Sequence, residues 1–214
     1  MIPTSYLQDA LYSYCESQSN SIPPYLTAIE KMTFEKCLTP QMLSGSIQGR
    51  ILSFISKISK PKLVLEIGTF TGYSALCLAE GLAPDGKLHT IEITENYNDF
   101  ISYIKKNTPF KSQIDFHIGN AKSLIPTLSG NFDLVFLDAA KKDYLEYLHI
   151  LENRMIAGGI LLTDNVLWSG KVIDDNRDEE TQVLRSFNEY LKSSPCWDVF
   201  ILPFRDGISI ALKK

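Results

Sequence analysis

The sequence of 214 residues lacks several features that would assign it to a common class of protein. Its four cysteines stand far apart, and no two of them form a C-x-x-C pair. This spacing argues against a disulfide framework and is typical of reduced thiols. No apolar run approaches the roughly 20 residues of a membrane-spanning helix, and residues 1–10 lack the pattern of a signal peptide. The sequence therefore predicts a cytoplasmic protein that does not interact with a membrane.

An excess of positive charge is also missing. The chain has 21 Lys and Arg residues against 25 Asp and Glu residues, which gives a formal net charge of −4. Proteins that bind nucleic acid along their surface usually show the opposite balance. Hydrophobic residues make up 44% and charged residues 21% of the chain, as in ordinary globular domains. The composition favours a single domain over residues 1–214 that acts on a small molecule and binds no nucleic acid.

From residue 62 onward, short apolar runs alternate with helical patterns, which is typical of a doubly wound α/β sheet. The turn at 205–207 joins the last two runs too closely for a parallel crossover, so we expect one antiparallel strand. The prediction is an α/β fold with a mostly parallel, seven-stranded sheet. Its strands are predicted at residues 63–65, 87–93, 114–118, 132–137, 159–163, 197–202 and 207–212. Its helices are predicted at residues 73–80, 95–107, 121–128, 142–153 and 179–192.

Three further helical patterns precede the first strand. They cover residues 6–18, 25–37 and 46–58, and the prolines at 23 and 24 end the first of them because proline removes a backbone donor. We expect residues 1–60 to form an N-terminal helical appendage to the α/β core of residues 61–214. The aromatic residues of this appendage, Tyr6, Tyr12, Tyr14 and Tyr25, are candidates for a dimer surface.

The loop after the first predicted strand carries Glu66, Gly68 and Gly72, at the edge where open α/β sheets bind ligands. It lacks the G-x-G-x-x-G spacing of dinucleotide-binding proteins. A carboxylate beside the first glycine repels a pyrophosphate and suits a cationic ligand. Glu92, at the end of the second strand, is placed to accept ribose hydroxyls. The alternative is that the glycines only form a turn and that Glu92 is a solvated strand end.

Further acids follow two later strands. Asp138 ends the fourth predicted strand, and Asp164 and Asn165 end the fifth. Each of them alone is more often the cap of a following helix than a ligand. Parallel strands, however, bring their carboxyl ends to one edge, where these side chains offer the hard oxygen ligands that Mg²⁺ prefers. We therefore expect a divalent metal site there.

These segments resemble the signature segments of two related groups. The pattern E-x-G-x-x-x-G is similar to the first motif of the Rossmann-like methyltransferases. The motifs DAAK at 138–141 and DNVLW at 164–168 resemble those of the cation-dependent O-methyltransferases, the family of the catechol and caffeoyl-coenzyme A enzymes. The resemblance continues at 66–74, 119–121 and 202–207, and it covers roughly residue 42 to the C-terminus. It implies a Rossmann-like methyltransferase fold.

The resemblance also implies a role for each matching residue. Lys141 is the expected general base, and Asp138 is both catalytic and, with Asp164 and Asn165, a ligand of a divalent cation, expected to be Mg²⁺. Trp168 and Arg205 are expected to contact the acceptor. S-adenosylmethionine would be the methyl donor and S-adenosylhomocysteine the product. The residues expected to bind this cofactor are Met42, Ser44, Glu66, Gly68, Thr69, Gly72, Ser74, Glu92, Ala121 and Asp138.

The sequence thus predicts a methyltransferase that acts on a hydroxyl of a small aromatic vicinal diol. The family is commonly dimeric, so a homodimer is expected. Three alternatives stay open: a methyltransferase with another acceptor, a nicotinamide-dependent oxidoreductase and a non-catalytic cofactor-binding module. Ala140 stands where the plant caffeoyl-coenzyme A enzymes tend to have an acid, which leaves the identity of the acceptor undecided.

Overall fold

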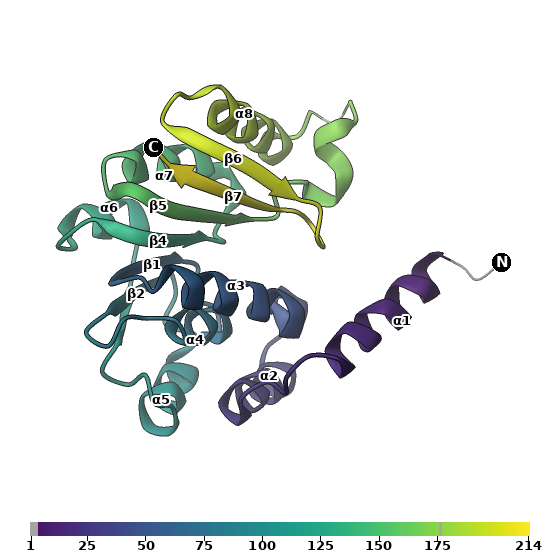
Figure 1. Ribbon diagram of the computed structural model, residues 1–214, viewed down its shortest axis with the longest axis vertical. Helices are drawn as coiled ribbons and strands as arrows, with labels where there is room; N and C mark the ends of the chain where they lie inside the picture. Colours follow the sequence, from purple (N-terminus) through teal and green to yellow (C-terminus); the bar gives the residue numbers. More distant parts are fainter. Residues whose placement is uncertain (1–3, 176) are drawn as a thin grey trace.

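The computed structural model describes residues 4–175 and 177–214. A seven-stranded sheet with the order β3-β2-β1-β4-β5-β7-β6 forms its centre (Figure 1). Five strands are parallel, and β7 is antiparallel to both of its neighbours, β5 and β6, as predicted. The strand order reverses between β1 and β4, so the sheet is doubly wound. The strands are β1 (Leu63–Ile67), β2 (Lys87–Glu92), β3 (Ile114–Ile118), β4 (Phe132–Leu137), β5 (Met155–Asp164), β6 (Trp197–Leu202) and β7 (Ile208–Lys213).

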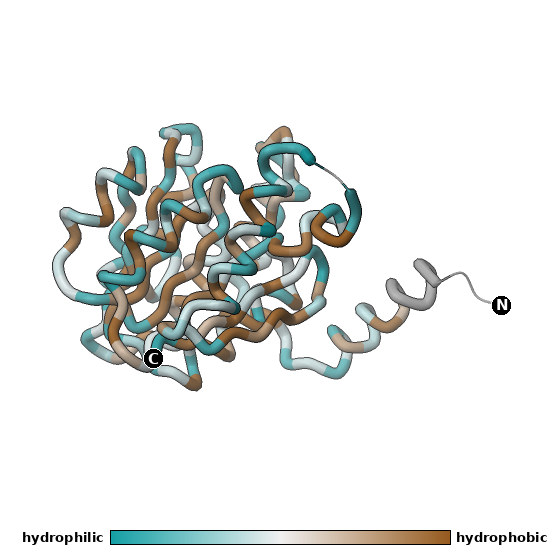
Figure 2. The backbone as a smooth tube through the Cα atoms, turned by 90° about the horizontal axis from the view of Figure 1, so that it is seen from above, coloured by the Kyte–Doolittle hydropathy of each residue, from teal (hydrophilic) through white to brown (hydrophobic). Residues whose placement is uncertain are grey.

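Helices cover both faces of the sheet, and the apolar side chains between the layers form two cores. Because side chains alternate along a strand, Val64 of β1 enters one core and Leu65 the other. Figure 2 shows the hydrophobic segments inside and the hydrophilic ones mostly at the periphery. None of the helices in the described part of the chain is long and apolar enough to cross a bilayer. The helices of the α/β part are α4 (Tyr73–Ala79), α5 (Asn98–Asn107), α6 (Ala121–Leu124), α7 (Tyr144–Glu152) and α8 (Glu179–Ser193).

Some element boundaries differ from the predicted ones, and proline explains one of the differences. The helix predicted over residues 121–128 ends at Leu124 and continues as a 3₁₀ turn, Ile125–Thr127, because Pro126 has no backbone N–H to donate. The helix predicted from residue 95 begins only at Asn98, and β5 begins at Met155 rather than at residue 159. The 3₁₀ helix Pro40–Met42 was not predicted, nor were the short turns within Trp168–Ile173, which are separated by the left-handed residues Ser169 and Gly170.

The three N-terminal helices form close to their predicted positions as α1 (Thr4–Ser17), α2 (Pro24–Lys36) and α3 (Gly45–Ser59). In Figure 1, α1 extends away from the body while α3 lies beside α4. Gly49 permits this close packing, since a Cβ atom there would lie 2.7 Å from Cε1 of Tyr73. The N-terminal segment therefore reaches the carboxyl-end edge of the sheet through α3.

Glu80, at the end of α4, fixes α3 against the sheet. Its carboxylate accepts hydrogen bonds from Arg50 at 2.7 Å, Ser53 at 2.7 Å and Lys57 at 2.6 Å, all of which lie on α3. Burial opposes the ionisation of Glu80, but the bonds from Arg50 and Lys57 outweigh it and lower the pKa to about 2. The carboxylate is thus charged and fully paired at neutral pH.

We expect Glu80→Ala to lower the free energy of unfolding by roughly 3 kcal/mol, because it leaves the half-buried Arg50 without its partner. Urea unfolding at neutral pH measures this loss. Glu35→Ala is the matched control, since Glu35 makes only an exposed i,i+4 pair with Lys31, and its effect should stay below about 0.5 kcal/mol. Equal losses in the two variants would contradict the role of Glu80.

Candidate active site

A cavity of about 610 Å³ opens at the carboxyl ends of β1, β2, β4 and β5, next to the point where the strand order reverses. This is where doubly wound sheets bind ligands. Most residues predicted from the sequence line it: Met42, Ser44, Gly68, Thr69, Ser74, Glu92, Ala121, Asp138, Lys141, Asp164, Asn165, Trp168 and Arg205. Two predicted residues, Glu66 and Gly72, are not part of the lining and lie behind it.

Gly68 brings the loop after β1 against the end of β4. Its φ is +105°, and a Cβ atom there would lie 1.9 Å from the carbonyl oxygen of Asp138. Only glycine fits such an approach in the left-handed region. The backbone N–H of Asp138 in turn donates to the carbonyl of Ile67 at 2.9 Å. The loop of the E-x-G-x-x-x-G motif and Asp138, a predicted metal ligand, are therefore in direct backbone contact.

Glu66 lies fully buried beneath this loop. One of its oxygens accepts a hydrogen bond from Thr90 at 2.5 Å, and the other has no partner within the described residues. Burial is the largest influence on Glu66 and, with the charges of Asp138 and Glu92, raises its pKa to about 8, although the hydroxyls of Ser74 and Thr90 act in the opposite direction. The neutral acid is therefore the favoured form of this buried group at neutral pH.

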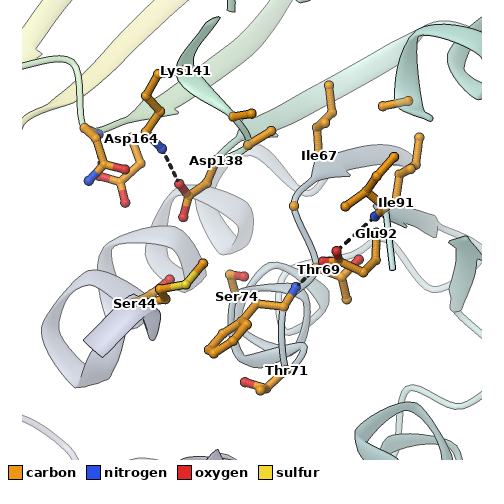
Figure 3. A pocket seen from close by; sticks show the side chains of 18 of the residues that line it. Ser44, Ile67, Thr69, Thr71, Ser74, Ile91, Glu92, Asp138, Lys141 and Asp164 are labelled. Carbon is orange, nitrogen blue, oxygen red and sulfur yellow. Dashed lines mark hydrogen bonds and ion pairs between the residues drawn. The ribbon is translucent and has the colours of Figure 1, made fainter. Parts of the chain in front are cut away.

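Glu92 holds the opposite side of the loop. One carboxylate oxygen accepts from the backbone N–H of Phe70 at 2.9 Å, and the other accepts from that of Ile93 at 2.9 Å. Figure 3 shows Glu92 and Thr69 together on one side of the cavity, with Asp138, Lys141 and Asp164 on the other. The cavity thus has two chemically distinct halves.

The second half contains a compact charged group. Nζ of Lys141 lies 3.0 Å from Oδ1 of Asp138 and 5.1 Å from the ring centre of Tyr144, and the lysine is only 8% exposed. Asp164 is 6% exposed, and its Oδ1 accepts from the backbone N–H of Asn165 at 2.8 Å. Burial and the charge of Asp138 raise the pKa of Asp164. The two aspartates are therefore close enough to repel each other.

The oxygens of Asp138, Asp164 and Asn165 fit a hard divalent cation by their chemistry. A cation between the two carboxylates would also relieve their repulsion. No three His, Cys, Asp or Glu side chains gather as a metal site would require within residues 4–175 and 177–214. A cation held here would thus take its third side-chain oxygen from the Asn165 amide.

Trp168 and Arg205 also line the cavity. Trp168 has a φ of 49°, and Nζ of Lys171 lies 5.7 Å from its ring centre. Arg205 donates to the carbonyl of Ser44 and, at 3.2 Å, to Oε1 of Gln48, so its guanidinium is engaged by α3. Gln48 was not predicted as a site residue. The sequence signal for it is modest: a polar residue one turn before the buried Leu52, on the buried face of α3.

The family follows from comparison with known proteins. The profile of the O-methyltransferase family matches residues 16–214. A caffeoyl-CoA O-methyltransferase from Stellaria longipes is 35% identical over 181 residues, which are 78% of this chain and 75% of that protein. A catechol O-methyltransferase from Niastella koreensis is 31% identical over 177 residues, 78% of this chain and 80% of that protein. The chain belongs to the O-methyltransferase family.

Solved structures agree with this assignment. The O-methyltransferase TomG from Streptomyces achromogenes, solved in complex with SAM, has a TM-score of 0.89 and 29% identity, and the match covers 96% of each chain. An O-methyltransferase from Bacillus cereus in complex with SAH has a TM-score of 0.89 and 26% identity, with 96% of this chain and 97% of that one covered. The predicted Rossmann-like methyltransferase fold is confirmed, and the oxidoreductase alternative is set aside.

The raised pKa of Glu66 predicts a pH-dependent stability. The neutral acid is favoured in the folded state, so its contribution is fully present below pH 4.5 and is lost as the pH rises toward 8. We expect the free energy of unfolding to fall between pH 5 and pH 8 by on the order of 2 to 4 kcal/mol more in the wild-type protein than in Glu66→Gln.

Urea unfolding of both proteins at the two pH values measures this difference. Other titrating groups are common to both proteins, so their contributions cancel. Equal pH dependence in the two proteins would show that Glu66 is ionised throughout.

Proposed function

We propose that this chain transfers a methyl group from S-adenosylmethionine to a hydroxyl of a small aromatic vicinal diol, with the help of a divalent cation, expected to be Mg²⁺. The observation that carries the proposal is the two-sided cavity. The loop with Gly68 and Glu92 forms one side, the group of Asp138, Lys141 and Asp164 forms the other, and Asp138 lies where they meet. A donor and an acceptor can therefore be bound next to each other.

Two features support S-adenosylmethionine as the donor, with S-adenosylhomocysteine as the product. The relatives TomG and the Bacillus cereus enzyme were solved in complex with SAM and SAH. The carboxylate of Glu92, which lines the cavity beside the loop, also suits a ligand with a sulfonium and an ammonium group. By the same argument, the pyrophosphate of a nicotinamide cofactor would be repelled.

The acceptor class follows from the other half of the cavity. Catechol and caffeoyl groups, which the names of the relatives contain, carry two neighbouring hydroxyls on an aromatic ring. The indole of Trp168 offers an aromatic wall, and the oxygens of Asp138, Asp164 and Asn165 offer ligands for a cation that two neighbouring hydroxyls can chelate. When bound, such a cation lowers the pKa of the hydroxyl that reacts.

Lys141 is the group we assign as the proton acceptor. Among the described residues that line the cavity, Lys141 is the only lysine. It lies beside Asp138 and has little exposure to water. Nζ forms an ion pair with Asp138 in the resting site, so it must first release its own proton to solvent, and the neutral amine then takes the proton of the acceptor hydroxyl. The resulting oxygen anion then takes the methyl group, and the sulfur leaves as a neutral thioether. Most of the rate gain would come from holding the two reactants in line.

The dependence on a cation gives the first functional test. With S-adenosylmethionine and catechol as substrates, we expect EDTA to lower turnover on the order of 100-fold or more and excess Mg²⁺ to restore it. The affinity for S-adenosylhomocysteine, measured by calorimetry in EDTA, serves as the control and should persist. Unchanged turnover in EDTA would refute a role for the cation, and binding of NAD in place of S-adenosylhomocysteine would refute the donor.

The proton acceptor is tested separately. We expect Lys141→Ala to lower kcat by roughly 10² to 10⁴-fold while the KM for the acceptor changes little, because the residue acts on a proton rather than on binding. The measurement is kcat as a function of pH. Lys142→Ala is the matched control, since this neighbouring lysine is exposed, and it should keep wild-type turnover. A near-normal pH profile in Lys141→Ala would remove Lys141 from the mechanism.

Three predictions from the sequence stay predictions: a homodimer, a cytoplasmic location and a single domain. Large apolar side chains on the outer faces of α2 and α3 are consistent with the first of them. Phe34, Phe54 and Ile58 are 62%, 60% and 80% exposed, respectively.

A further inference from the structure

Gln48 lies between two parts of the site that the sequence did not connect. It belongs to α3, and its side chain is almost fully buried at 1% exposure. Its Nε2 donates to Oδ2 of Asp164 at 2.8 Å, and its Oε1 accepts from Arg205 at 3.2 Å. A single amide thus joins the N-terminal segment to the end of β5 and to the turn before β7.

Arg205 determines which end of this amide meets Asp164. A guanidinium can only donate, and an ionised carboxylate can only accept. The amide oxygen must therefore face Arg205, and the amide NH₂ must face Asp164. The reversed amide would place donors against donors and an oxygen against a carboxylate, which would leave both ends unpaired in a buried place.

The carboxylate of Asp164 is consequently held by two donors on its two oxygens. Gln48 binds Oδ2, and the backbone N–H of Asn165 binds Oδ1 at 2.8 Å. Each oxygen has a second lone pair that remains available to a cation. Hydrogen bonds of this kind orient metal ligands, and their removal typically weakens metal binding by about 10 to 100-fold.

We propose that Gln48 is a positioning residue that holds Asp164 in the orientation that receives the divalent cation, with Arg205 keeping the amide the right way round. The inference rests on the proposed function, which requires a cation at Asp138, Asp164 and Asn165. It gives the N-terminal segment a part in metal binding. Arg205 then has two roles: it orients the Gln48 amide, and it is predicted to contact the acceptor.

Calorimetric titration with Mg²⁺, without acceptor, tests the inference on the full chain. Gln48→Met keeps the length of the side chain and removes the donor, so we expect the Kd for Mg²⁺ to rise about 10 to 100-fold. The Kd for S-adenosylhomocysteine in EDTA should equal that of the wild-type protein. Loss of a residue with only a structural role would weaken the binding of Mg²⁺ and of S-adenosylhomocysteine together.

Gln113→Met is the matched control. Gln113 also donates through its amide, to the carbonyls of Ala83 and Gly86, but it does not line the cavity. Its Kd for Mg²⁺ should equal that of the wild-type protein. A rise in this control as large as in Gln48→Met would overturn the inference, because any lost amide bond would then have the same effect.

The remaining outcomes separate the inference from the proposed function. If the wild-type protein binds no Mg²⁺, the proposed role of the cation fails, and the inference fails with it. If the wild-type protein binds Mg²⁺ and Gln48→Met binds it equally well, only the positioning role is overturned. If thermal unfolding shows that Gln48→Met does not fold, Arg205→Met is the replacement variant, because it removes the hydrogen bond that orients the Gln48 amide. We expect a smaller rise in its Kd for Mg²⁺, and an unchanged Kd would overturn the inference.

Discussion

The repulsion among carboxyl groups gathered at one edge of the sheet is the constraint on which the site depends. Glu66, Glu92, Asp138 and Asp164 all lie at the carboxyl ends of the central strands, and each is accommodated differently. Glu92 uses backbone donors, Asp138 an ammonium, Asp164 an amide and a backbone N–H, and Glu66 a raised pKa. Binding of a cationic donor and a divalent cation would reduce the same repulsion.

The N-terminal segment is part of this arrangement. The bonds from Arg50, Ser53 and Lys57 to Glu80 hold α3 on α4. The same helix then delivers Gln48 to Asp164, and the backbone leading into it delivers the carbonyl of Ser44 to Arg205. The bonds that pack α3 on α4 and the bonds that α3 makes in the cavity therefore depend on the same helix.

The sequence predicted the parts of the site that depend on local pattern. Strands read from apolar runs place their last residues at one edge, so Glu92, Asp138 and Asp164 could be expected together before any contact was known. Residue contacts over long separations could not be predicted in this way. Gln48 and Asp164 are 116 positions apart, and no periodicity connects them. Glu66 was placed correctly on its strand, but its position behind the lining depends on the packing of Thr90 and the loop above it.

The reversal of strand order between β1 and β4 has a consequence for how such enzymes diverge. The loop that follows β1 and the segment that follows β5 belong to separate crossover units on either side of the reversal. The segment around Trp168, which we propose contacts the acceptor, is therefore separate in the chain from the backbone that we propose binds the donor. A fold organised in this way can keep one methyl donor through evolution while its lineages acquire different acceptors.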